Sequence, residues 1–295
     1  MRASLLAWPI VKRMLAYCAV LGIWTSGMLI ITGLDTTIVG HFNFAETAFY
    51  AIAATPVSFI SQVLHAALTP LMPAVSALSV SNSSGKMGEM LERTTRYTMV
   101  ILEAAGLPLI LFGFSLLSIW VGPEYAKHSL GLMRILVLAH IIRNICAPYS
   151  SMVLATGMQR VATASGVCEA MVNLVSSIVL GKFYGATGVA FGTLLGACVG
   201  VMLHFVVSMR KTQQNFAIHP FSLFQKGVLR PGIASLPTLI LLPLFWRPFS
   251  VPFTLGIALA WGLVSAVIAW RAGLSIPERS QITFKLRGMI PGIAR

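Results

Sequence analysis

The sequence predicts an all-α fold, a polytopic membrane helix bundle of about eight transmembrane helices. Of its 295 residues, 57% are hydrophobic and only 10% are charged, whereas charged residues make up about 25% of an average soluble domain. The mean hydropathy is +0.84. Apolar stretches of ~20 residues, long enough to cross the hydrocarbon core of a bilayer, recur along the chain.

Eight apolar segments define the predicted helices. The second segment is unusually long and lies within residues 47–85, which contain no charged side chain, so it could hold one span or two. We predict one helix with a kink at Pro56, Pro70 or Pro73. The predicted helices are Met14–Leu34, Ala48–Leu78, Tyr97–Val121, Ser129–Leu154, Val161–Leu180, Gly188–Ser208, Ile233–Trp246 and Val251–Trp270.

The distribution of basic residues decides the number of spans and their orientation. With a single second span, sixteen Lys and Arg side chains fall on one side of the membrane and three, Lys127, Lys182 and Arg247, fall on the other. Because cytoplasmic loops accumulate Lys and Arg, both termini are predicted to be cytoplasmic. The basic tail after Trp270 is predicted to lie against anionic membrane lipids.

The net charge of +13 is explained by this bias and does not indicate a nucleic-acid partner. Signatures of nucleotide, zinc or nucleophilic-serine sites are absent, so we expect no enzyme, no cofactor and no metal site. The four cysteines, at positions 18, 146, 168 and 198, lack the spacing of metal ligands and are interpreted as small core residues.

Polar side chains follow one face of each of two consecutive spans. His140, Arg143, Asn144 and Ser151 do so in the fourth span, and Ser165, Glu169, Asn173 and Ser176 do so in the fifth. Counted from the turn between the spans, the depths of Arg143 and Glu169 differ by about 6 Å at 1.5 Å per residue. Long side chains can cross that distance, so the two charges are expected to lie close together.

Two interpretations of Arg143 and Glu169 remain open. The charges neutralise each other and lock a helical hairpin, or they line a solvated cavity and meet a charged substrate. We favour the second for Arg143, because an ionisable residue inside a membrane span is costly and is usually functional. Asn144 and Asn173 also suit hydrogen bonding between helices.

Other polar positions give weaker signals. Asp35 ends the first span, at the interface or at a cavity mouth. Glu103 is interpreted as an interfacial residue and His65 as an interior histidine with partners. A stripe of small residues at spacings of three and four is interpreted as a packing surface, because small side chains let helix backbones approach closely. Its members are Gly185, Gly188, Gly192, Gly196 and Gly200.

Several segments, taken in order, resemble the second lobe of polysaccharide-biosynthesis flippases of the multidrug/oligosaccharidyl-lipid/polysaccharide exporter superfamily. They read GLDTTIVGHF, AFYAIA, LTPLMPAVSAL, LLSIWVGPEY, LATGMQR and NLVSSIVLGKFYGATGVAFGT. The resemblance implies a six-helix transporter lobe over residues 1–210. Residues 211–295 would then add two C-terminal spans and the basic tail.

The resemblance implies a function in lipopolysaccharide or exopolysaccharide synthesis. Such flippases move undecaprenyl-pyrophosphate-linked oligosaccharides across the bacterial inner membrane through a central cavity lined by cations. Arg143 would then face the cavity, Glu169 would hold it between substrates or couple to a proton, and Asp35 matches an acidic position of this lobe. Arginine suits phosphate because its planar fork bonds bidentately. His140, Asn144 and Asn173 complete the candidate cavity residues.

Members of this family have about fourteen spans, so the expected bundle is one lobe of two. A second copy or a separately encoded N-terminal lobe would supply the other wall, or the chain is a truncated remnant. A cation-coupled multidrug exporter, a flippase for lipid-linked peptidoglycan precursors and a non-transporting subunit of a glycan-assembly complex remain alternatives.

Overall fold

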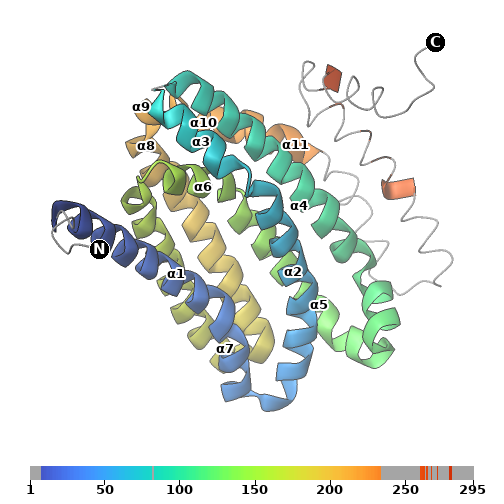
Figure 1. The fold of residues 1–295 in the computed structure, drawn as a ribbon. Helices are drawn as coiled ribbons and strands as arrows, with labels where there is room; N and C mark the ends of the chain where they lie inside the picture. The colour runs from blue at the N-terminus through green and yellow to red at the C-terminus, as the bar shows by residue number, and fades with distance from the viewer. Residues whose placement is uncertain are drawn as a thin grey trace, which may run out of the picture.

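The computed structural model describes residues 8–81, 83–233, 260–262, 264, 267, 271 and 279–280, and this part of the chain is helical without a strand (Figure 1). The long elements are α1 (Trp8–Phe42), α2 (Thr47–Leu68), α3 (Leu71–Val80), α4 (Ser84–Val121), α5 (Pro123–Asn144), α6 (Ala147–Ala155) and α7 (Gln159–Leu203). The prediction of an all-α membrane bundle is confirmed. The seventh and eighth predicted spans lie almost entirely outside the described residues.

Short elements follow α7 and gather at the end of the bundle that also holds α3 and α6 (Figure 1). They are η3 (His204–Ser208), α8 (Met209–Lys211), α9 (Gln213–Phe216), α10 (Pro220–Leu223), η4 (Phe224–Leu229) and α11 (Arg230–Gly232). A single turn, η2 (Phe44–Glu46), joins α1 to α2 at the opposite end.

The long second segment is one span, as predicted. Residues Phe44–Val80 form a continuous stretch of membrane-spanning length, and the kink falls between Leu68 and Leu71. Pro70 lies at this break, because a proline has no backbone N–H to donate to the helix hydrogen bonds. Pro56 lies inside α2 and does not end it.

Helix α7 is two spans folded back on each other at Gly185. This glycine has φ 57° and ψ −139°, a backbone conformation in which a Cβ is strained. A Cβ on Gly196 would lie 2.7 Å from the Cβ of Asn173, and one on Gly192 would meet the backbone of Ser177. The glycine stripe therefore lets the two arms, residues 159–184 and 186–203, pack with their backbones close together, which confirms the predicted packing role.

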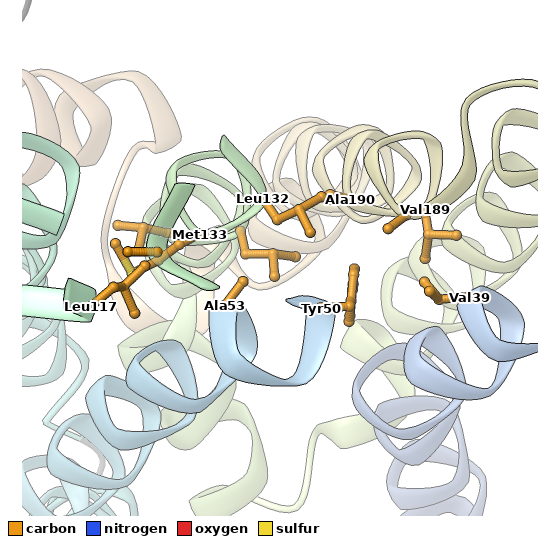
Figure 2. Close-up of a cluster of buried hydrophobic side chains, with 12 residues drawn as sticks. Val39, Tyr50, Ala53, Leu117, Leu132, Met133, Val189 and Ala190 are labelled. Atoms are coloured by element: carbon orange, nitrogen blue, oxygen red, sulfur yellow. The ribbon is translucent and has the colours of Figure 1, made fainter. Parts of the chain in front are cut away.

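Two apolar cores stabilise the ends of the bundle. The first joins α1, α2, α4, α5 and α7 through side chains such as Val39, Tyr50, Leu117, Met133 and Val189 (Figure 2). The second joins α3, α4, α6 and α7 to the short elements near α8, and includes Leu91, Tyr149 and Phe216. Along α5 and α7, the polar residues around Arg143 and Glu169 lie between these two cores.

The outer surface suits a lipid environment. Large apolar side chains such as Phe59, Met171 and Ile178 are exposed along the helices. Trp120 and Tyr184 are exposed near helix ends, where amphipathic rings favour the membrane interface. By length and apolar composition, Phe44–Val80, Ser84–Val121 and Gln159–Lys211 each qualify to cross a membrane, as does α5 joined to α6. The hairpin in α7 makes the third of these a double crossing.

Candidate functional site

The site lies where the fourth span bends. Helix α5 ends at Asn144 and α6 begins at Ala147, with an angle of 40° between them. Pro148 explains the position of the break, because its ring clashes with the carbonyl of residue 144 and it offers no backbone N–H. Arg143 is thereby placed in the last turn of α5, where the negative end of the helix dipole favours a cation.

Arg143 and Glu169 form an ion pair across two helices. The Nε of Arg143 donates to Oε1 of Glu169 over 2.6 Å, and the two side chains are only 14% and 8% exposed. The expected proximity of these charges is confirmed. Another nitrogen of the guanidinium, Nη2, is buried and has no hydrogen-bond partner within the described part of the chain. The guanidinium therefore keeps donor capacity that Glu169 does not use.

The glycine stripe positions the acid of this pair. A Cβ added at Gly200 would lie 2.7 Å from the Cδ of Glu169 and 3.0 Å from the Cβ of Glu169. Gly200 thus leaves the space that the carboxylate occupies between the two arms of α7. The sequence marked Gly200 for packing alone. Its role beside Glu169 follows from the antiparallel register of the hairpin, which brings positions 169 and 200 together.

A cavity of about 260 Å³ opens beside the ion pair. Its walls come from α1, α2, α3, α5, α6, α7 and η3, and part of the lining is apolar. The polar side chains in the lining are His65, Arg143, Asn144, Ser150, Ser151, Gln159, Glu169 and His204. An apolar wall with a few convergent polar groups is the usual character of a binding site.

His65, Gln159 and His204 were not expected in this lining. His65 is exposed on α2, which corrects its interpretation as an interior histidine with partners. Gln159 is the first residue of α7, and His204 directly follows its last residue. Both were identified only from the lining of the cavity.

Of the predicted site residues, Arg143, Glu169 and Asn144 line the cavity, and His140 lies just behind it. The ring of His140 is buried, with its Nε2 3.3 Å from Oγ of Ser61 on α2. The Nδ2 of Asn144 donates to the backbone carbonyl of His140 over 2.9 Å. His140 therefore joins α5 to α2, and Asn144 connects this contact to the cavity wall.

Asp35 and Asn173 lie away from the cavity. Tyr50 and Thr193 both donate to Oδ2 of Asp35, over 3.0 and 2.8 Å, so the buried carboxylate joins α1, α2 and the second arm of α7. Asn173 is 1% exposed and lies between the arms of α7 against Gly196. Its Oδ1 accepts from Ser177 on the same arm over 3.5 Å and its Nδ2 has no partner among the described residues, so the predicted hydrogen bond between helices is not observed.

Glu103 is buried on α4, and its interfacial depth stays a prediction. One further expectation needs correction. Of the cysteines, Cys146 is buried, whereas Cys18, Cys168 and Cys198 are exposed and are not core residues. Among the described residues, no group of three or more His, Cys, Asp or Glu side chains could hold a metal ion.

Neither known family models nor curated proteins match this chain. A search of solved structures finds the lipid II flippase MurJ in an inward closed conformation, with 16% sequence identity and a TM-score of 0.56. The match covers 87% of this chain and 53% of that one, so the chain spans about half the length of the flippase it resembles. The fold is therefore that of a multi-pass membrane transporter. The matched protein is a flippase.

Proposed function

We propose that the chain translocates a polyprenyl-pyrophosphate-linked oligosaccharide across a bacterial inner membrane, as one lobe of a flippase for surface polysaccharide synthesis. The observation that carries this proposal is the cavity-facing Arg143, which is held by Glu169 through one nitrogen and keeps a second buried nitrogen unpaired. The fold shared with a lipid II flippase supports a lipid-linked substrate.

In this proposal Glu169 and the pyrophosphate compete for one guanidinium. Without substrate, the 2.6 Å bond to Glu169 compensates the buried positive charge, which would otherwise be costly in a membrane. A pyrophosphate that enters the cavity can displace the carboxylate and bond the guanidinium through two nitrogens, since bidentate contacts to phosphate are strong. The charge of Arg143 is then compensated in both states, and release of the substrate restores the ion pair.

The second wall of the pathway is also part of the proposal. Alternating access requires two units that move relative to each other around a site, and the match to the solved flippase covers only 53% of its length. We propose that a second copy of this chain or a separately encoded N-terminal lobe supplies the other unit. Membrane lipids surround the assembly.

The test measures binding of an undecaprenyl-pyrophosphate oligosaccharide to the full chain in nanodiscs. Arg143→Gln is expected to weaken binding at least tenfold, because charge-assisted hydrogen bonds are lost. Glu169→Gln is expected to tighten binding, because it removes the competitor. Arg134→Gln is the matched control: Arg134 also lies on α5, but it donates to the carbonyl of Ile110 over 2.9 Å and does not line the cavity.

Translocation is measured separately, in proteoliposomes that carry the same lipid with a fluorophore that an external reagent can quench. Unchanged binding in Arg143→Gln would refute the substrate role and leave the ion pair as a structural lock. Binding without translocation, in the presence of a partner lobe, would favour a non-transporting subunit of a glycan-assembly complex. Preference for an amphipathic cation would favour the multidrug exporter.

A second candidate substrate within the same mechanism is the lipid-linked peptidoglycan precursor. The solved structure of similar fold favours this substrate, since that protein is a lipid II flippase. Both substrates carry a pyrophosphate, so Arg143 serves either one. Competition between the two lipids in the nanodisc assay decides which is preferred.

A further inference from the structure

A second hollow lies on the outer surface of the bundle. It has a volume of about 630 Å³ and runs between the second arm of α7 and the short elements that follow it. It shares no lining residue with the cavity beside Arg143. Its lining is Ile142, Cys198, Val201, Met202, Phe205, Val206, Arg210, Gln213, His219, Pro220, Phe221 and Phe224.

The groove is apolar along its length and polar at one end. Met202 and Val206 are 56% and 49% exposed, and Phe221 is 69% exposed. Phe205 and Phe224 meet edge to face with ring centroids 5.6 Å apart, which joins the two walls. A concave, exposed strip of this kind fits the hydrocarbon chain of a lipid, because it has no polar group that a methylene chain would leave unpaired.

The polar end is cationic. Arg210 lies beyond the apolar strip, at the end of the bundle where α8, α9 and α10 gather (Figure 1). The stretch 209–232 holds four basic residues, Arg210, Lys211, Lys226 and Arg230, and no acidic residue. Arg210 is exposed, and its side chain makes no hydrogen bond or ion pair with any described residue. His219 and Gln213 stand beside it in the lining as further polar groups.

We propose that this groove binds one anionic phospholipid, such as phosphatidylglycerol, from the leaflet at that end of the bundle. The phosphate contacts Arg210, and one acyl chain lies along Met202 and Val206. Two features of the groove argue for a specific site and against a general basic surface. The unpaired guanidinium is at the mouth of a hydrocarbon-lined hollow, and Lys211, the next residue, does not line it.

The experiment measures lipid retention by native mass spectrometry on the purified full chain. The probes are phosphatidylglycerol and phosphatidylcholine with identical acyl chains, which differ in net charge. The wild-type chain is expected to retain phosphatidylglycerol about tenfold more than phosphatidylcholine, and Arg210→Gln is expected to abolish that preference. Lys211→Gln removes one exposed charge from the neighbouring position and is expected to keep it.

A second pair of variants tests the acyl-chain position. Val206→Trp fills the groove and is expected to lower retention of phosphatidylglycerol at least fivefold. Val167→Trp is the matched control, because Val167 is an exposed valine (38%) on the first arm of α7 and is not part of the groove. Melting temperatures measured in parallel identify a variant that fails to fold, in which case Arg210→Gln, a change at an exposed side chain, decides.

Equal retention of the two phospholipids would overturn the proposal. Equal losses in Arg210→Gln and Lys211→Gln would overturn it too, and would indicate a diffuse basic surface. A preference for a polyprenyl phosphate over phosphatidylglycerol would show that the groove holds a substrate tail. The outcome is independent of the proposed flippase function, because Arg210→Gln is expected to leave binding of the pyrophosphate lipid at Arg143 unchanged.

Discussion

Glu169 and Gly200 face each other across the hairpin of α7, and the carboxylate that holds Arg143 occupies the space that a side chain at position 200 would fill. The ion pair therefore depends on the absence of a side chain at position 200. The glycine stripe therefore explains both the close packing of the two arms and the position of the Glu169 carboxylate.

Gly200→Ala is expected to push the Glu169 carboxylate away from Arg143 and to cost about 1–3 kcal/mol of stability, the usual effect of an inserted methyl group in a filled interior. Thermal unfolding in detergent or nanodiscs measures the cost. Gly131→Ala on α5 is the control, because a Cβ there meets nothing within 4 Å; it is expected to be neutral or stabilising by up to ~1 kcal/mol. Equal melting temperatures for both variants would contradict the tight fit at Gly200.

Breaking the ion pair from either side is expected to be more harmful than removing both charges. Glu169→Gln leaves a buried, uncompensated guanidinium, and loss of one partner of a buried pair costs about 3–5 kcal/mol. The double variant Arg143→Gln, Glu169→Gln is expected to recover a large part of that loss. A double-mutant cycle of unfolding measurements gives the coupling between the two residues, and additive effects would mean that the charges do not interact.

The Asp35 network is expected to contribute to stability. Tyr50→Phe and Thr193→Val each remove one donor to the same oxygen and are expected to cost about 0.5–1.5 kcal/mol. Their combination leaves the buried carboxylate without these donors, so it should cost more than the sum. Thr163→Val is the control, because its hydroxyl donates only within its own helix, to the carbonyl of Gln159, and it should leave the melting temperature nearly unchanged.

Glu46 is expected to stabilise the turn of the α7 hairpin. Its Oε2 accepts from the backbone N–H of Ala186 over 2.6 Å, at the start of the second arm, where helix N–H groups lack partners and a negative charge is favourable. Glu46→Ala should destabilise the fold by about 0.5–2 kcal/mol, as for the loss of an N-cap. Glu124→Ala, at a residue with an 84% exposed side chain, should have little effect on thermal unfolding. Equal changes in stability for Glu46→Ala and Glu124→Ala would contradict this role of Glu46.

The sequence by itself determined the class of fold and most of the crossings, because apolar length and the bias of basic residues are local properties that a bilayer selects directly. It also predicted that Arg143 and Glu169 lie close together, since two antiparallel spans joined by a short turn fix their relative depth. The glycine spacing predicted the close approach within α7 for a similar reason.

The tertiary structure alone decided which faces are inside. Lipid is as apolar as a protein core, so hydrophobicity does not separate a buried cysteine such as Cys146 from an exposed one such as Cys198. Polar residues of the fourth span, such as Arg143 and Asn144, line a cavity at the bend, and His65 of α2 lines it too. Asn173 lies between the arms of α7. One partner of Asp35, Thr193, lies 158 residues along the chain. Such contacts depend on helix rotation and register, which packing sets and local composition does not encode.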